Sequence, residues 1–228
     1  EGIGKAAAIS MAKEGAKVVI CARTQANLDI AAEEIYKHGG SDVLTVSADV
    51  TDLKQISSVI EKTFSEFGRL DIIVNNAGTS AGNNFEVVDD DAWRHDMDLK
   101  FYAAIRFSRM AIPYMKAIGG GRIINVTNLG GKQPGANSVP TSVTRSAGIA
   151  LTKALSKDLA EHNILVNTVC IGLIKAGQHE RRVAQMQQEN PLLTLAKFYE
   201  QRSQNIPLGR IGEAREAGDV ICFLASER

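Results

Sequence analysis

Short runs of consecutive apolar residues recur along the chain and alternate with segments whose apolar residues follow helical spacing. The runs are rich in β-branched residues, which is typical of parallel strands covered by helices on both faces. This alternation predicts an α/β fold: a doubly wound parallel sheet in a three-layer αβα sandwich. The predicted strands are 18–21, 43–46, 70–74, 123–126 and 164–169.

Three segments between these runs carry an apolar stripe and are predicted to be helices. No linker, repeat or low-complexity tract divides the chain, so we expect one domain over 1–228. The polar, Gln-rich segment 177–205 is expected to be a helical insertion that acts as a lid. The acidic run 89–91 is interpreted as a helix start rather than a metal site. The stripes are Ile56, Val59, Ile60 and Phe64; Trp93, Met97, Phe101 and Ile105; and Ala147, Leu151, Leu155 and Leu159.

Composition narrows the classes of ligand. The 228 residues include 26 Lys and Arg against 26 Asp and Glu, so the formal net charge is zero. Without a basic block, the chain is expected to bind neither nucleic acid nor a membrane, and a small neutral or weakly charged ligand is favoured. The odd number of cysteines, Cys21, Cys170 and Cys222, indicates reduced, buried residues of a cytoplasmic protein.

A glycine-rich turn opens the chain. Gly2-Ile3-Gly4 precedes an alanine-rich helical segment, and the N–H groups at such a helix start suit a pyrophosphate. After the strand at 18–21 comes Arg23, with no acidic residue beside it to hold a ribose hydroxyl. An arginine there can pair with a 2′-phosphate, which favours NADP over NAD; the alternative is a solvated residue at a helix start.

Several motifs occur together in one order and resemble the short-chain dehydrogenase/reductase family. The resemblance extends over essentially all 228 residues. It implies a single Rossmann-like domain with a seven-stranded parallel sheet, of which this chain would lack the first, central strand and the last. The motifs are Gly2-x-Gly4, Ala48-Asp49-Val50-Thr51, Asn75-Asn76-Ala77-Gly78, Asn125-Val126, Val166-Asn167 and Ile206-Pro207-Leu208-Gly209-Arg210.

The same resemblance implies a cofactor site and an assembly. The site is expected to bind NADP(H) in preference to NAD(H), or else to hold no cofactor. Asp49 would contact the adenine. Helices 92–110 and 144–161 would form the interface of a homodimer or homotetramer. The implied cofactor-binding residues are Gly2, Ile3, Gly4, Arg23, Asp49, Val50, Asn75, Ala77, Gly78, Arg145 and Gly172.

The family's catalytic residues are all replaced. Members normally use a Tyr-x-x-x-Lys pair with a Ser and an Asn. This sequence is expected to place Thr141, Arg145, Asn128 and Asp98 at those four positions. Thr141 can donate a hydrogen bond but ionises too weakly to be a general acid near pH 7. Arg145 can hold ribose hydroxyls, Asn128 can polarise a carbonyl, and Asp98 is expected to pair with Arg145 or Lys100. Ile171 and Ala176 depart from the family as well.

Two functions therefore stay open at this point. One is an oxidoreductase that interconverts a carbonyl and an alcohol on an unknown small molecule with a non-standard site. The other is a catalytically impaired member that serves as a nucleotide-binding, regulatory or structural subunit. Tyr102 and Lys132 are alternative proton donors, although packing for Tyr102 and a solvated loop for Lys132 are the simpler interpretations.

Overall fold

The computed structural model describes residues 1–40 and 42–228, and the predicted strands are present in it. The described residues form five strands, and every pair that hydrogen-bonds is parallel. Each predicted apolar run lies in one of them, apart from a shift of a few residues at the ends. The strands are β1 (Val18–Ala22), β2 (Val43–Ser47), β3 (Ile72–Asn75), β4 (Gly121–Asn128) and β5 (Ile164–Ile171).

The strands form two separate sheets rather than one. β1 pairs with β2, and β3, β4 and β5 pair in that order. This arrangement agrees with the expectation that, of the family's seven strands, the central one and the last are not found among the described residues. β1 and β3 do not pair with each other, and a cavity between them is lined on one side by Val19 and Ile20 and on the other by Ile72 and Ile73.

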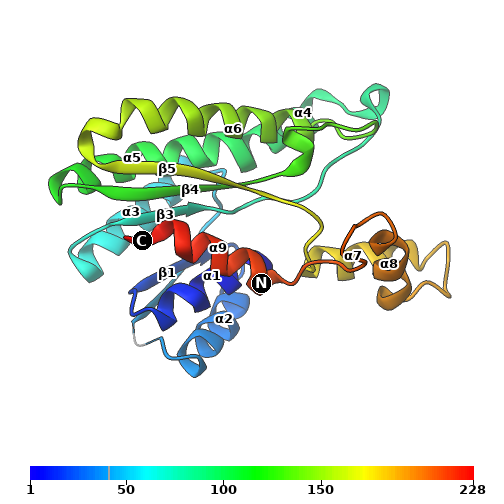
Figure 1. The fold of residues 1–228 in the computed structure, drawn as a ribbon, viewed down its shortest axis with the longest axis horizontal. Helices are drawn as coiled ribbons and strands as arrows, with labels where there is room; N and C mark the ends of the chain where they lie inside the picture. Colours follow the sequence, from blue (N-terminus) through cyan, green and yellow to red (C-terminus); the bar gives the residue numbers. More distant parts are fainter. Residues whose placement is uncertain (41) are drawn as a thin grey trace.

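Helices cover both faces of the strands, as expected for three layers (Figure 1). α3, α5 and α6 lie on one side, and α1, α2 and α9 lie on the other. Neighbouring residues of β4 alternate between the two cores, since Ile123 packs with the first group and Ile124 with the second. These helices are α1 (Gly2–Lys13), α2 (Gln25–Lys37), α3 (Leu53–Phe67), α5 (Ala103–Ala117), α6 (Thr141–Asp158) and α9 (Ala214–Ala225).

The predicted helix around Trp93 contains a π-helical turn. α4 (Asp90–Met97) runs into the π-turn η2 (Asp98–Tyr102), which leads into α5. Asp89 caps α4 by accepting a hydrogen bond from the Ala92 amide at 2.8 Å, which confirms the interpretation of the acidic run. The apolar stripe from Trp93 to Ile105 is only half-buried, and the inner face carries Asp96 and Lys100 instead.

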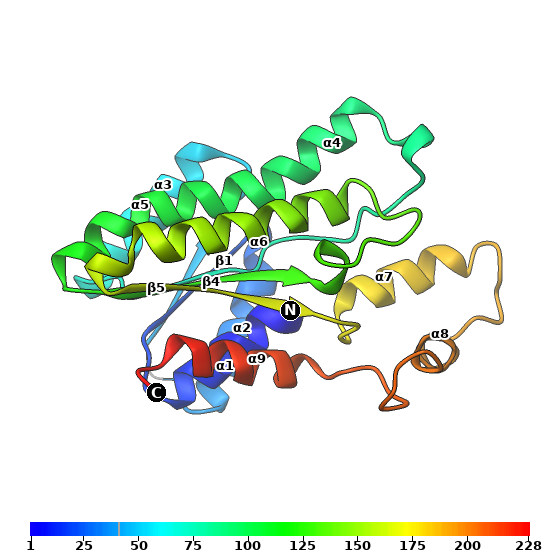
Figure 2. The ribbon, with the colours of Figure 1, turned by 45° about the horizontal axis from the view of Figure 1, so that its top comes forward.

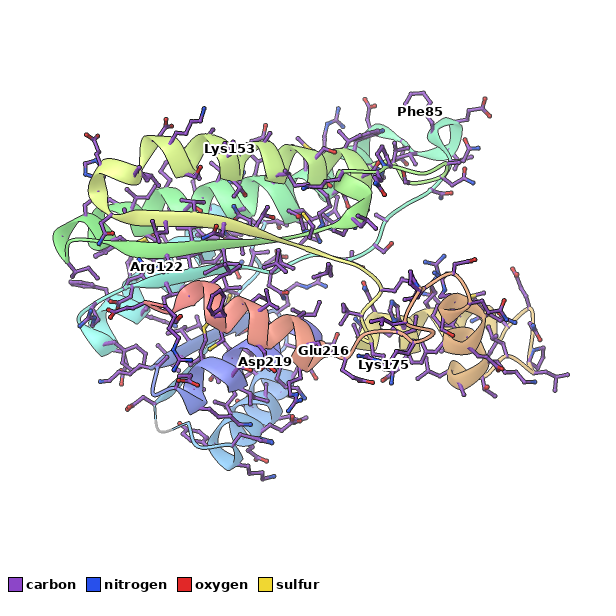
Figure 3. All side chains as sticks on the ribbon, viewed as in Figure 1. Phe85, Arg122, Lys153, Lys175, Glu216 and Asp219 are labelled. Atoms are coloured by element: carbon purple, nitrogen blue, oxygen red, sulfur yellow. The ribbon has the colours of Figure 1, made fainter. Side chains whose placement is uncertain are left out.

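Segment 177–205 is helical, as predicted, and projects from the body of the domain (Figure 2). α7 (Gly177–Met186) and α8 (Leu195–Ser203) pack on each other through Val183, Leu193 and Phe198. Lys175, which precedes α7, is paired with Glu213 before α9, and Figure 3 shows it where the segment joins the body.

Short 3-10 helices complete the fold, namely η1 (Phe85–Val87), η3 (Leu129–Gly131) and η4 (Ala160–His162). The three cysteines are free and half-buried rather than fully buried. Within the described ranges, no helix has the length and apolarity needed to cross a membrane.

Candidate active site

Two cavities reach the carboxyl ends of the strands. The larger, of about 1420 Å³, runs the whole length of the space between β1 and β3, from Lys17 and Asp71 before the strands to a groove that passes the start of α1. The smaller, of about 420 Å³, contains Thr141 and is bordered by α7 and α8. Ser80, in the loop after β3, lines both cavities and marks where they adjoin. Ligands of doubly wound folds bind at this edge of the strands, so the two cavities are the candidate site.

The start of α1 is suited to bind phosphate. No side chain caps its first amide groups, and its first turn carries no acidic residue. Gly2 has a φ of +62°, and a Cβ on Gly4 would lie 2.7 Å from Asn76 Nδ2. Gly2, Ile3 and Gly4 line the groove, as predicted from the glycine turn. Exposed N–H groups at a helix start, with close backbone approach, fit the pyrophosphate of a dinucleotide.

Arg23 and Asp49 lie on the β1–β2 side of the groove with Val50. Asp49 accepts hydrogen bonds from the Thr51 amide at 2.9 Å and the Thr51 hydroxyl at 2.8 Å. These bonds, with a smaller contribution from the Arg23 charge, lower the pKa of Asp49 below its ordinary value. The Arg23 side chain is exposed and has no ion-pair partner in the described structure, so it is available to an anion.

Arg145 lies opposite, beside the loop that follows β3. Its Nη1 donates to the Val126 carbonyl oxygen at 2.8 Å, whereas its buried Nε has no partner among the described atoms. A Cβ on Gly78 would lie 2.5 Å from Arg145 Nη2, so the glycine permits this close approach. Burial lowers the pKa of Arg145, and the Asp96 charge opposes this effect. An unsatisfied buried donor next to the groove fits a cofactor oxygen.

Of the other predicted cofactor-binding residues, two line the groove and one does not. Ala77 lines the groove with Gly78. Asn75 also borders it, but its amide nitrogen donates to Asn125 Oδ1 at 2.8 Å and so links β3 to β4. Gly172 is exposed after β5 and does not line either cavity.

The Thr141 hydroxyl lies at the centre of the site. Its oxygen accepts a hydrogen bond from Lys100 Nζ at 2.9 Å and another from the Ala81 amide at 3.0 Å. A hydroxyl oxygen has two acceptor positions and one hydrogen to donate. Both acceptor positions are therefore used, and the hydrogen of Thr141 is free for an acceptor in the adjoining cavity.

Lys100 and Asp96 form a buried ion pair behind Thr141. Their side chains are 1% and 2% exposed, and Lys100 Nζ donates to Asp96 Oδ1. The other oxygen of Asp96 accepts from the Thr144 hydroxyl at 2.7 Å. Burial lowers the pKa of Lys100 to about 8, although the Asp96 carboxylate acts in the opposite direction. An ammonium group with this pKa can give up a proton near neutral pH.

Two of the four predicted catalytic positions lie outside this cluster. Asp98 does not pair with Arg145 or Lys100; its carboxylate faces Arg106 Nη2 at 3.3 Å, and Asp96 takes the expected place. The reason is geometric, because two residues along a helix turn the side chain by about 200°. Asn128 Oδ1 caps η3 by accepting from the Gly131 amide at 3.1 Å, and the residue lines neither cavity.

The alternative proton donors lie elsewhere as well. Tyr102 is 44% exposed, and its ring faces the Arg106 guanidinium. Lys132 is exposed and borders neither cavity.

Sequence reasoning missed Asp96 and Lys100. The available signal was their i, i+4 spacing, which places opposite charges on one helix face. Such pairs usually lie on the surface, and only the packing of α6 against the π-turn buries this one.

Comparisons with known proteins place the whole chain in one family. Residues 1–228 match the family model described as enoyl-(acyl carrier protein) reductase. The NADPH-dependent reductase BacG of Bacillus subtilis (strain 168) is 32% identical over 228 residues, which cover 100% of this chain and 88% of BacG.

Solved structures are similar over the same length. L-sorbose reductase from Gluconobacter frateurii, complexed with NADPH and L-sorbose, has a TM-score of 0.94 and 32% identity, covering 100% of this chain and 86% of that one. A short-chain oxidoreductase from Pseudomonas aeruginosa PAO1 is described as containing an atypical catalytic center. Its structure has a TM-score of 0.89 and 32% identity, and the match covers 99% of this chain and 86% of that one.

Proposed function

The chain belongs to the short-chain dehydrogenase/reductase family, and from that premise we propose that it interconverts a carbonyl and an alcohol on a small molecule with NADP(H). The start of α1, Arg145 and Arg23 would hold the pyrophosphate, a ribose and the 2′-phosphate in turn. When bound, the nicotinamide supplies or accepts the hydride. The names of BacG and L-sorbose reductase, both linked to NADPH, support this choice of cofactor.

The observation that carries the proposal is the hydrogen bonding of Thr141. Lys100 and the Ala81 amide occupy both acceptor positions of its hydroxyl oxygen. The hydroxyl hydrogen therefore points to a substrate oxygen that enters the adjoining cavity. Thr141 holds this oxygen and supports the negative charge that develops on it during reduction.

Lys100 supplies the proton through Thr141. During carbonyl reduction the substrate oxygen takes the Thr141 hydroxyl proton, and Lys100 Nζ donates a proton to Thr141 Oγ1 in the same step. Alcohol oxidation reverses both transfers. The threonine never needs to ionise fully, which removes the objection that its own pKa is too high. The Asp96 carboxylate accepts a hydrogen bond from Lys100 Nζ and so stabilises the cationic form of Lys100.

The α7–α8 segment would cover the substrate, as a lid does. Its place beside the Thr141 cavity supports this role. Ser80 donates its amide to Gln178 Oε1 at 3.4 Å, and Arg181 pairs with Glu1 at 2.7 Å, so α7 contacts both the loop after β3 and the start of α1. Closing this segment would exclude water from the reacting oxygen.

The exposed flank of the long helices would join copies of the chain in a dimer or tetramer. Trp93, Met97, Phe101 and Ile105 are half-buried in the single chain, and Val143 on α6 is 45% exposed. An apolar flank of this kind supports burial against a second copy.

A pair of substitutions at Thr141 tests the proposed function. Thr141→Ser keeps the hydroxyl and should keep most of the carbonyl reduction, whereas Thr141→Val should lower kcat by about 100-fold or more. NADPH binding, measured by nicotinamide fluorescence, should be the same in both variants. If wild-type protein binds NADPH but reduces no carbonyl compound in a broad panel, the chain is instead a catalytically impaired nucleotide-binding member.

A further inference from the structure

The cavity next to Thr141 is polar and positively charged. It is bordered by Arg182 from α7 and Arg202 from α8. Its other polar side chains are uncharged, and the described residues that line it include no carboxylate. They are Ser80, Asn137, Ser138, Thr141 and Ser142.

Neither arginine has a carboxylate partner in the described structure. This sets them apart from Arg181, the neighbour of Arg182, which pairs with Glu1. Arg202 is half-buried, and its guanidinium lies 4.5 Å from the centroid of the Phe198 ring. Phe198 is 4% exposed in the small core between α7 and α8, so this contact fixes the position of the Arg202 charge.

The charges of Arg182 and Arg202 also lower the pKa values of neighbouring groups. Burial, followed by the nearby Arg182 charge, lowers the pKa of Arg202. Burial and then the charges of Arg202 and Arg182 lower the pKa of His179, whose buried Nδ1 has no hydrogen-bond partner among the described residues. A half-buried Arg202 and an exposed Arg182 therefore border one cavity without a carboxylate partner in the described structure, and an anion bound between them would offset their repulsion.

We propose that Arg182 and Arg202 bind an anionic group of the substrate, a carboxylate or a phosphate, while Thr141 holds the oxygen that is reduced. This rests on the function proposed above and adds the class of substrate. A cavity of about 420 Å³ suits a small molecule with both groups. Guanidinium groups form paired, charge-assisted hydrogen bonds with both kinds of oxyanion.

Matched substrates test this proposal and separate the two anions. Acetoacetate is compared with methyl acetoacetate, and dihydroxyacetone phosphate with dihydroxyacetone. In each pair the reacting group is a ketone, and the second member carries an uncharged group in place of the anion, a methyl ester in the first pair and a free hydroxyl in the second. At least one anionic member should show a kcat/KM about 10-fold or more above its neutral counterpart. The pair that shows the preference identifies the anion.

Substitutions on α7 and α8 show whether Arg182 and Arg202 cause the preference for the anionic substrate. The double variant Arg182→Met/Arg202→Met should lose about 10- to 100-fold in kcat/KM for the anionic substrate and change little for the neutral one. Methionine keeps most of the side-chain length and its contact with Phe198. Lys197→Met is the matched control, because Lys197 is an exposed cation on α8 that does not line the cavity. It should leave both rates unchanged.

A binding measurement gives a readout that does not need turnover. The pKa of His179 is followed by NMR, with His179→Gln to assign its signal. Sodium acetate or inorganic phosphate should raise this pKa in the wild type, since a bound anion offsets the two arginine charges, and should not do so in the double variant.

The outcomes separate the two proposals. If an anion raises the pKa of His179 but no carbonyl is reduced, the anion site stands and the oxidoreductase function fails. If neutral and anionic substrates react equally and neither anion moves this pKa, the anion site is overturned and the oxidoreductase function stands.

Discussion

Lys100 Nζ donates a hydrogen bond to Thr141 Oγ1 at 2.9 Å, although the two residues are 41 positions apart and lie on different helical segments. This contact joins a buried cation with a pKa of about 8 to a hydroxyl at the edge of the substrate cavity. In the proposed function this contact supplies the proton, in a chain where no tyrosine is followed by a lysine four residues later.

Removing Lys100 alone should destabilise the fold. Lys100→Met leaves the Asp96 carboxylate buried without its counter-charge, which typically costs about 3–5 kcal/mol. Asp96→Asn/Lys100→Met removes both charges and keeps an acceptor for Thr144, so it should recover most of that loss. Urea unfolding measures both free energies. A double variant as unstable as Lys100→Met would contradict the account of a charge-balanced pair.

Arg23 should select NADPH over NADH. Arg23→Ala is expected to weaken NADPH binding by about 10- to 100-fold and leave NADH binding unchanged, because only NADPH carries the 2′-phosphate. Nicotinamide fluorescence measures both dissociation constants. Arg94→Ala is the control, since Arg94 pairs with Asp90 and Asp91 on α4, outside the groove. Unchanged NADPH binding in Arg23→Ala would mean that Arg23 is only a solvated residue at a helix start.

Substitution of Arg145 should affect the binding of both cofactors, whereas substitution of Arg23 should affect NADPH alone. Arg145 lies beside Gly78, and the proposed function assigns to it a ribose, a group that both cofactors carry. Arg145→Met should therefore weaken NADPH and NADH binding to a similar degree. A loss confined to NADPH would show that Arg145, and not Arg23, reads the 2′-phosphate.

The fold was predictable because buried parallel strands have a distinct sequence pattern. The apolar runs located all five strands, but β4 extends to Asn128 and β5 to Ile171, beyond the predicted ends. The additional residues include polar ones, such as Thr127, whose hydroxyl is hydrogen-bonded to Thr168 at 2.9 Å. The sequence does not show that such a polar group will find a partner inside the fold.

The residues that line the groove were more predictable than the contacts around Thr141. Local motifs identified Gly2, Gly4 and Gly78, since a turn or a close backbone approach requires a particular residue at a particular place. The roles of Lys100, Arg182 and Arg202 depend on contacts between distant segments, which spacing along the chain does not reveal. The expectation for Asp98 failed to account for which face of the helix meets α6.

The pH dependence of carbonyl reduction shows whether Lys100 supplies the proton through Thr141. With NADPH saturating, kcat/KM should be level below pH 8 and fall about tenfold per unit above it, because Lys100 must be protonated to donate and its pKa is about 8. In Asp96→Asn/Lys100→Met the remaining rate should be low and should lack this inflection. The same inflection in that variant, or a level wild-type profile from pH 7 to about 10, would contradict proton supply by Lys100 through Thr141.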